Sequence, residues 1–429
     1  MTQSRTQPAS MRPTIVAGLD IGSSKTAVVI AEVSGDSPQR AQVKILGVGQ
    51  ARTGGIRREI VTDIEATTES VRKAVKEAEL MAGVSVQKLY TGIAGEHIHA
   101  WPSTGVVAVG RGPGGDGEIT SGDVDRVQEV ARAVVIPGDR ELIHAIPQEY
   151  IVDAQGGIRD PVGMAATRLE AEVFIVTGSA TSGQNIRKAV TRAGYQLAEL
   201  VLEPLASSLA VVTEDEKEIG IALVELGGGT TDVCVFHERK IRHLTSLPWG
   251  GATVTNDIAK GLSLPYAEAG RAKERYGVAR ADLVRPDETF EVPGAAAGQT
   301  RHVARELLAH IIEQRMDEIF GLVAAELDRG GFANQLGGGI VLTGGGAGMQ
   351  GVLELAERGF AAPVRIGIPG EGLGGLADSV RRPKFSTAAG LAVYGSRRVV
   401  SEAPEGSAMS GASVNGVIRW MRDWISDFF

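Results

Sequence analysis

Two stretches, LDIGSSKT (19–26) and VELGGGTT (224–231), decide the fold, because the second repeats the pattern of the first. Each reads as a strand that ends in an acid, followed by an apolar residue, a glycine, a turn of small residues and a second β-rich strand. Asp20 corresponds to Glu225 in this comparison, and Gly22 corresponds to Gly227. Such a hairpin presents backbone N–H groups and small hydroxyls at its tip, and these suit phosphate oxygens. One copy could be an ordinary turn in a chain with 57 glycines, but two copies in two half-chains indicate a repeated phosphate-binding unit.

A third glycine-rich stretch, IVLTGGGAG (340–348), follows a β-rich run and precedes a helical one. Gly346, Gly348 and Gly351 form a G-x-G-x-x-G pattern, which taken alone would suggest a Rossmann dinucleotide site. That pattern usually opens the first βαβ unit, whereas here it lies near the end of the chain and precedes only a short helical run. The Walker A sequence G-x-x-x-x-G-K-[ST] does not occur. A Rossmann enzyme and a P-loop enzyme are therefore both rejected.

Length, charge and cysteine content narrow the class of protein further. The 429 residues are enough for two substantial domains, and the net charge of −8 with a pI near 5.6 argues against a nucleic-acid-binding protein. The single cysteine, Cys234, lies in an apolar strand-like run and is expected to be a buried structural thiol. The polar N-terminus lacks the apolar segment of a signal peptide, and no run of 18 apolar residues could span a membrane. We therefore expect a cytosolic protein that binds no nucleic acid.

Two phosphate hairpins and a late glycine-rich loop resemble the actin/Hsp70/sugar-kinase superfamily. Within it, the chain is similar to the bacterial FtsA cell-division family from about residue 14 to about residue 395, and its amphipathic end is similar too. The blocks that carry this resemblance are IPQEYIVD (146–153), DPVGMAATRLEAEV (160–173), LASS (205–208), VTEDEKEIGIALVELGGGTTDV (212–233), IVLTGGGA (340–347) and VRIGIP (364–369). The resemblance implies an α/β, actin-like fold. Two ribonuclease-H-like domains would surround a nucleotide cleft, with two inserted subdomains and a C-terminal amphipathic helix.

The resemblance also divides the chain into segments. These are a flexible tail (1–13), domain 1A (14–87 and 173–203), an inserted small domain 1C (88–172), domain 2A (204–252 and 336–385), subdomain 2B (253–335), a return helix to 1A (386–395), a flexible linker (396–413) and a membrane-targeting helix (414–429). The residues indicate a similar organisation, because helical periodicity occurs at 63–83, 119–134, 183–194 and 304–327. In the second of these helices, Val124, Val127, Ala131 and Val134 share one face.

ATP and Mg²⁺ are the cofactors that the resemblance implies. The matching positions are Gly22, Ser23, Ser24 and Lys25 in the first phosphate loop, Gly227, Gly228, Gly229 and Thr230 in the second, Gly344, Gly345 and Gly346 in the adenosine loop, and Glu268 with Lys273 on a helix that contacts adenine and ribose. Lys25 would offer a point positive charge to a phosphate. Gly270 stands where the family commonly has a second Glu, so sugar recognition by this helix is in question. Glu268 and Lys273 could equally be a solvated helical pair.

The acids of the site are implied in the same way. Asp20, Glu225 and Asp232 would hold Mg²⁺ mainly through its waters, and Glu203 matches an acid that orients water for attack on the γ-phosphate. Glu225 stands where the family usually has Asp, and one extra methylene moves the carboxylate by about 1.5 Å. Misplacement on the order of 1 Å can cost about 100-fold in rate. We therefore expect ATP binding with slow or negligible hydrolysis.

The C-terminal stretch VNGVIRWMRDWISDFF (414–429) follows a segment rich in Ser, Gly, Ala and Pro, which reads as a linker. On a helical wheel, Val414, Val417, Ile418, Met421, Trp424, Ile425 and Phe428 share one face, opposite Arg419, Arg422, Asp423 and Ser426. Such a helix suits a membrane interface, with Val417, Trp420, Met421, Trp424, Ile425 and Phe428 in contact with lipid. The alternative is that it folds back on the protein or into a partner's groove. Its arginines are offset by Asp423, Asp427 and the terminal carboxylate, so apolar burial should dominate.

The function implied by the resemblance is cell division. The protein would polymerise on the cytoplasmic face of the membrane at the division site, tether the FtsZ ring and help to recruit later division proteins through domain 1C. The FtsZ C-terminal tail, typically acidic in part, would bind subdomain 2B at Arg301 and Arg315, although each arginine could instead be a solvated helix-face charge. The alternative is an Hsp70-like ATPase acting as a chaperone or reactivating factor. A chaperone of this class carries a β-rich peptide-binding domain after the ATPase, and only residues 396–429 follow here.

Overall fold

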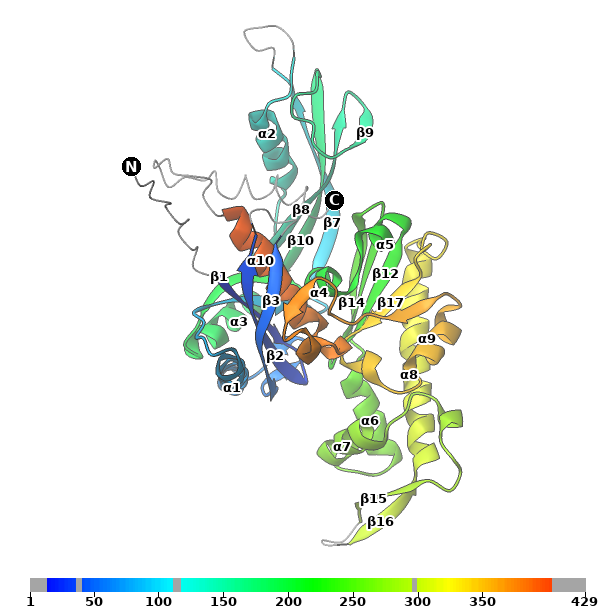
Figure 1. The fold of residues 1–429 in the computed structure, drawn as a ribbon. Coiled ribbons are helices and arrows are strands. Elements are labelled where there is room, and N and C mark those ends of the chain that lie inside the picture. Colours follow the sequence, from blue (N-terminus) through cyan, green and yellow to red (C-terminus); the bar gives the residue numbers. More distant parts are fainter. Residues whose placement is uncertain (1–13, 36–40, 111–116, 295–298, 403–429) are drawn as a thin grey trace, which may run out of the picture.

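The computed structural model describes residues 14–35, 41–110, 117–294 and 299–402. In Figure 1 these residues form two sheet-based bodies side by side, with a smaller lobe above and another below. No helix within these ranges combines the length and the apolar character needed to cross a membrane.

The first body is built on a six-stranded sheet in the order β11-β6-β1-β2-β3-β19. Its strands are β1 (Thr14–Ile21), β2 (Lys25–Ser34), β3 (Gln42–Arg52), β6 (Lys88–Ile93), β11 (Gln196–Leu202) and β19 (Leu373–Gly375). The strands β1 to β3 are antiparallel, and β6 and β11 run parallel to β1. Helices α1 (Ile64–Ala82) and α3 (Ala180–Arg192) cover one face, and α10 (Ser386–Glu402) covers the other. Because β2 is covered on both faces, it is apolar without alternation.

The second body repeats this path in the order β14-β13-β12-β17-β18. Its strands are β12 (Ile221–Leu226), β13 (Thr231–His237), β14 (Lys240–Leu247), β17 (Ile340–Thr343) and β18 (Val364–Ile366). The first three are antiparallel and the last two run parallel to β12. The β1–β2 and β12–β13 hairpins therefore occupy equivalent places in the two sheets, as the repeated glycine pattern predicts. Cys234 is fully buried in β13, which confirms the expectation of a structural thiol.

The upper lobe in Figure 1 is a four-stranded sheet, β7-β10-β8-β9, with α2 packed on it. Its elements are β7 (His99–Ala108), α2 (Ser121–Arg132), β8 (Arg140–Val152), β9 (Gln155–Ile158) and β10 (Arg168–Ser179). Thr120 and Asp123 form a reciprocal capping box that starts α2. As predicted, Val124, Val127 and Ala131 are buried on one face of this helix, and Val134, two residues beyond its end, packs against the same core.

The borders of this lobe differ from the segment 88–172 expected for the inserted domain. Strand β6 pairs with β1, so residues 88–93 belong to the first sheet. Strand β10 pairs with β7 without a break as far as Thr177, so the lobe's sheet continues past residue 172. The limits of the lobe therefore follow from strand pairing, because a strand pair crosses each of the two expected borders.

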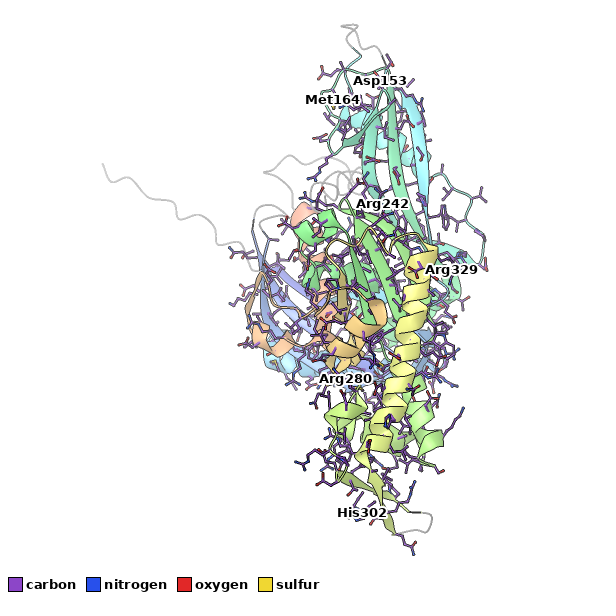
Figure 2. All side chains as sticks on the ribbon, turned by 90° about the vertical axis from the view of Figure 1, so that its right-hand side faces the viewer. Asp153, Met164, Arg242, Arg280, His302 and Arg329 are labelled. Carbon is purple, nitrogen blue, oxygen red and sulfur yellow. The ribbon has the colours of Figure 1, made fainter. Side chains whose placement is uncertain are left out.

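The lower lobe is mainly helical. Its elements are α6 (Gly251–Gly261), α7 (Tyr266–Tyr276), β15 (Thr289–Pro293), β16 (Thr300–Ala304) and α8 (Arg305–Arg329). The long helix α8 runs from the β15–β16 hairpin up along the second body (Figure 2), and its buried residues share one core with β12 and β13. This core fixes the lobe to the second body.

Short elements complete the two bodies. They are β4 (Ile56–Arg57), β5 (Ile60–Val61), α4 (Glu203–Val211), α5 (Glu214–Ile219), α9 (Val352–Phe360) and the 3₁₀ turns η2 (Ala281–Leu283), η3 (Gly345–Gly348), η4 (Ala377–Val380) and η5 (Pro383–Phe385).

Two helices join the bodies and cross between them. Helix α4 follows β11 of the first sheet and leads through α5 to the second, and α10 leads back to the first. They share one core with strands of both sheets. At the crossing, a Cβ added to Gly390 would overlap the carbonyl oxygen of Ala206, so the two backbones are in direct contact. We call α4 and α10 the hinge helices.

Gly390→Ala is expected to destabilise the protein by about 3 kcal/mol, because the added methyl group must push the hinge helices apart inside a packed core. Thermal unfolding followed by circular dichroism measures this. Gly321→Ala is the matched control, since Gly321 also lies inside a helix but has open space around its Cα. That change should be neutral or should stabilise by up to about 1 kcal/mol. Equal melting temperatures for the two variants would contradict the close crossing.

Helix α10 is longer than the return helix expected at 386–395. It continues to Glu402, so residues 396–402, expected to begin the linker, are helical. Val399 and Val400 pack against the shared core, and Arg398 forms an ion pair with Glu199 at 3.1 Å. These tertiary contacts explain the extra turns, which the local composition did not predict.

Candidate functional site

The two glycine hairpins have the same local geometry. In the first loop, between β1 and β2, the Gly22 N–H donates to the Lys25 carbonyl at 3.1 Å. In the second loop, between β12 and β13, the Gly227 N–H donates to the Thr230 carbonyl at 2.9 Å. The sequence repeat is therefore a repeat of the turn itself.

The two loops face each other across the two bodies. A Cβ built on Gly228 would lie 2.7 Å from Ser24 Oγ, and one built on Gly229 would lie 2.5 Å from Ser23 Oγ. Real Cβ contacts are longer, so only glycine allows this approach. The structure thus brings the predicted residues of both loops, from sheets far apart in the sequence, to one place.

Buried acids surround these loops. Asp20 at the end of β1, Glu225 at the end of β12, Asp232 on β13 and Glu203 at the start of α4 are all buried. Lys25 Nζ forms an ion pair with Asp20 at 2.8 Å. The structure therefore assembles the three acids expected at the metal and the acid expected to orient water.

The charges of these acids disfavour one another. Burial raises the pKa of Asp232 to about 6 and the pKa of Glu225 to about 7. Burial, followed by the charges of Glu59 and Asp20, raises the pKa of Glu203 well above its usual value. A bound cation would favour the ionised forms of all these groups. Within the described part of the chain, no three His, Cys, Asp or Glu side chains converge closely enough to hold a metal ion directly.

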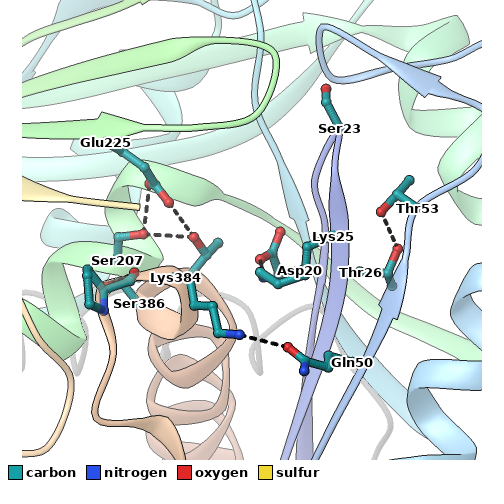
Figure 3. Close-up of polar contacts among 12 residues, drawn as sticks. Asp20, Ser23, Lys25, Thr26, Gln50, Thr53, Ser207, Glu225, Lys384 and Ser386 are labelled. Atoms are coloured by element: carbon teal, nitrogen blue, oxygen red, sulfur yellow. Dashed lines mark hydrogen bonds and ion pairs between the residues drawn. The ribbon is translucent and has the colours of Figure 1, made fainter. Parts of the chain in front are cut away.

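Glu225 differs from the other acids in its partners. Ser207 Oγ on α4 donates to Glu225 Oε2 at 2.9 Å, and Thr387 Oγ1 on α10 donates to Glu225 Oε1 at 2.5 Å. Figure 3 shows Glu225 turned toward Ser207, across from Asp20 and Lys25. Both of its oxygens therefore contact the hinge helices.

Glu59 is a residue of this site that the sequence did not reveal. Ser23 Oγ donates to Glu59 Oε1 at 2.9 Å, and the Glu59 N–H donates to Ser23 Oγ at 3.1 Å. Burial, with the charge of Asp232, raises the pKa of Glu59 to about 8. It lies in the turn between β4 and β5, with φ of 61°, and no motif marks it. Its carboxyl group therefore accepts hydrogen bonds from the backbone N–H and the hydroxyl of Ser23 in the first loop.

The third glycine loop lies beside the second. Gly344 has φ of 85°, and a Cβ on it would lie 2.6 Å from the Leu226 carbonyl oxygen. A Cβ on Gly346 would lie 2.9 Å from Leu226 Cβ, whereas Gly345 faces open space. The loop thus packs on the end of β12, immediately before the second phosphate loop.

Lys273 and Glu268 do not form a pair with each other in the structure. Lys273 Nζ donates to the Gly251 carbonyl at 2.7 Å, and the Gly251 N–H donates to the Gly227 carbonyl at 3.0 Å. Burial lowers the pKa of Lys273. Glu268 instead forms an ion pair with Arg271 on its own helix. Lys273 is therefore linked to the second loop through Gly251, while Glu268 pairs with Arg271 of its own helix.

The residues expected to bind a partner lie on the lower lobe. A groove of about 770 Å³ between α6 and α8 is lined in part by Asp257, Lys260, His310, Gln314, Arg315 and Glu318. Arg315 forms ion pairs with Asp257 and Glu318 inside the chain. Arg301 on β16 donates to the Leu262 carbonyl at the end of α6. The lipid-contacting residues expected at 417–428 lie outside the described residues.

Comparisons with known proteins agree on one family. A family model for the cell division protein FtsA matches residues 222–390, and a model for the SHS2 domain inserted in FtsA matches residues 95–177. The chain is 42% identical over 415 residues to a cell division protein FtsA of Neisseria meningitidis, covering 96% of this chain and 98% of the relative. It is 41% identical over 419 residues to one from Pseudomonas aeruginosa, with 97% and 98% covered. The corresponding protein of Escherichia coli K12 is 36% identical over 422 residues, with the same coverage.

Solved structures confirm the fold class. A PilM–PilN type IV pilus biogenesis complex aligns with a TM-score of 0.62 at 18% identity, covering 89% of this chain and 98% of that one. MreB5 of Spiroplasma citri bound to ADP aligns with a TM-score of 0.51 at 12% identity, covering 89% and 95%. The predicted α/β, actin-like architecture with an inserted small domain is therefore confirmed.

Proposed function

The chain belongs to the FtsA family of cell division proteins, and from this premise we propose that it binds ATP with Mg²⁺, polymerises on the inner face of the cytoplasmic membrane and attaches the FtsZ ring to it. The observation that carries the nucleotide part is the meeting of two glycine hairpins from two sheets above buried acids. The match along almost the whole chain leaves the Hsp70-like alternative unfavoured.

The two loops supply the groups that phosphates require. The N–H groups of Ser23, Ser24, Gly228 and Gly229 lie where the hairpins face each other, and Lys25 adds a positive charge. The third loop, at Gly344 to Gly346, and Lys273 lie beside the second hairpin, on the side proposed for adenosine. ATP would therefore lie between the two bodies.

The acids fit the magnesium ion that accompanies the phosphates. Asp20 and Asp232 would hold its waters, because both are buried beside the loops. Bound Mg²⁺ would offset the phosphate charge. Glu203 would orient the water that attacks the γ-phosphate. Glu59 accepts hydrogen bonds from Ser23, so a phosphate must displace it. These features agree with our prediction of slow or negligible hydrolysis.

The chain would also bind other division proteins and membrane lipid. The upper lobe would contact later division proteins, and the segment 414–429 would bind lipid at the division site. Pelleting of the full chain with liposomes, with and without Mg-ATP and FtsZ, tests the whole proposal. FtsZ should pellet only when the chain is present. Absence of the chain from the liposome pellet under every condition would contradict it.

Arg301→Glu combined with Arg315→Glu is expected to weaken binding of an FtsZ C-terminal tail peptide about tenfold or more, because the lobe loses two positive charges that face an acidic partner. Fluorescence anisotropy of the labelled peptide measures the affinity. Arg329→Glu is the control, since Arg329 also lies on α8 and pairs with an acid, Glu326, but neither residue lines the groove. Unchanged peptide affinity in the double variant would show that the tail binds another surface.

A further inference from the structure

Glu225 is the acid of the site whose two oxygens contact both hinge helices. Ser207 on α4 and Thr387 on α10 each donate a hydrogen bond to one of its oxygens, at 2.9 and 2.5 Å. The two hydroxyl oxygens lie 3.1 Å apart, so either hydroxyl could turn its single proton to the other instead of to the carboxylate. All three residues are buried. We call Ser207, Glu225 and Thr387 the hinge clasp, and Figure 3 shows Glu225 turned toward Ser207 within it.

The hinge clasp lies next to the point where the two bodies are joined. Ser207 follows Ala206, whose carbonyl oxygen faces Gly390 of α10 at the helix crossing. The residue before Thr387, Ser386, hydrogen-bonds Thr343 at the end of β17. The first turn of α10 therefore binds the ends of two neighbouring strands of the second sheet, and Glu225 hydrogen-bonds a residue of each hinge helix.

The hinge clasp is also continuous with the second phosphate loop. Gly227, two residues after Glu225, begins that loop, and its carbonyl and that of Gly228 accept hydrogen bonds from the start of α6. Glu225 therefore lies two residues from the second phosphate loop and in contact with both α4 and α10, the helices that join the two bodies.

The length of the side chain matters for this contact. The carboxylate must reach hydroxyls on two helices at once, and a residue one methylene shorter would place it about 1.5 Å back. We propose that Glu225 is a positioning residue that ties the second phosphate loop to both hinge helices, rather than a ligand of the metal. The proposal deepens the nucleotide-binding function proposed above and rests on it only for the coupling to nucleotide.

Four variants of the full chain distinguish a positioning role of Glu225 from a role as a metal ligand. Glu225→Ala removes the clasp and the charge, while Ser207→Ala with Thr387→Val removes the hydroxyl partners and keeps the carboxylate. Glu225→Gln keeps the clasp, because an amide can accept from one hydroxyl and donate to the other, but it removes the charge that a metal ligand needs. Ser208→Ala is the matched control, since this equally buried neighbour donates only to Leu205 of its own helix.

Two measurements apply to each variant. The first is ATP affinity as a function of Mg²⁺ concentration, by calorimetry. The second is the distance distribution between spin labels at Leu80→Cys on α1 and Tyr266→Cys on α7, two exposed positions attached to different bodies. Cys234 is fully buried and should not be labelled.

Glu225→Ala and the double hydroxyl variant are expected to share one defect, namely a broader distance distribution and about tenfold weaker ATP binding. Glu225→Gln should stay within about twofold of the parent with an unchanged Mg²⁺ dependence, and Ser208→Ala should match the parent. A lost Mg²⁺ dependence in Glu225→Gln, together with parental behaviour of the hydroxyl variant, would overturn the proposal. If the parent bound no ATP, the proposed function would fail. The spin-label distances in the nucleotide-free protein would then still test the positioning role of Glu225. An unbroadened distance distribution in the double hydroxyl variant would overturn that role.

Discussion

Gly228→Asp is expected to lower the affinity for Mg-ATP by on the order of 100-fold or more, since like charges brought together cost several kcal/mol. Gly228 faces Ser24 of the opposite loop so closely that a Cβ would lie 2.7 Å from its hydroxyl and 3.1 Å from its backbone nitrogen. The new carboxylate would therefore lie where the two loops meet. It would add negative charge beside buried acids whose pKa values are already raised. Calorimetry with Mg-ATP measures the effect.

Gly228→Asn is the control that separates charge from size, because the two side chains have the same shape. If Gly228→Asp loses more affinity for Mg-ATP than Gly228→Asn does, the negative charge of the Asp side chain opposes the phosphates. An equal loss in both would assign the effect to steric overlap between the loops. Unchanged ATP affinity in Gly228→Asp, in a variant with a normal melting temperature, would show that the nucleotide binds elsewhere.

The parts of the site that could be predicted from the sequence are those encoded locally. The hairpin pattern of acid, apolar residue and glycine occupies consecutive residues, so Asp20 and Glu225 were both placed at strand ends correctly. Helix α1 was predicted for the same reason, because its helical periodicity lies within one continuous stretch. In the structure Asp63 caps its start and Gly83, with φ of 67°, ends it.

The parts that could not be predicted depend on contacts between distant segments. Glu59 contacts Ser23 across 36 positions, and nothing in its own neighbourhood marks it as part of a phosphate loop. Glu225 accepts a hydrogen bond from Thr387, which is 162 positions away in the sequence. The sequence showed that this acid is one methylene longer than usual but not what the extra length reaches.

The two helix-borne residues expected near adenosine show the same limit. The alternative to a nucleotide contact was a solvated pair, but Lys273 is buried against Gly251 and Glu268 forms an ion pair with Arg271. Likewise, the turns of α10 after residue 395 depend on Val399 and Val400 packing against the shared core, which a polar local composition does not indicate.

The expected C-terminal helix (414–429) lies beyond the described residues. Trp424→Glu is expected to release the full chain from liposomes, because Trp424 is central among the apolar residues of the expected helix. Burial of one large apolar side chain contributes about 1.5–3 kcal/mol, and the charged replacement adds a cost of its own. With about 1.4 kcal/mol per factor of ten, membrane partitioning should fall by on the order of 10- to 100-fold. Liposome pelleting measures it.

Ser426→Glu is the matched control, because it adds the same charge to the polar face and should leave pelleting nearly unchanged. Higher salt should also matter little, since Arg419 and Arg422 are offset by Asp423, Asp427 and the terminal carboxylate. One such helix is a modest anchor, so polymers that present many of them should bind far more tightly than single chains. Removal of residues 414–429 should then leave ATP and FtsZ binding intact while the complex stays in solution. Continued pelleting of the truncated chain would place the anchor elsewhere, and equal pelleting of Trp424→Glu and Ser426→Glu would show that the apolar face does not drive binding.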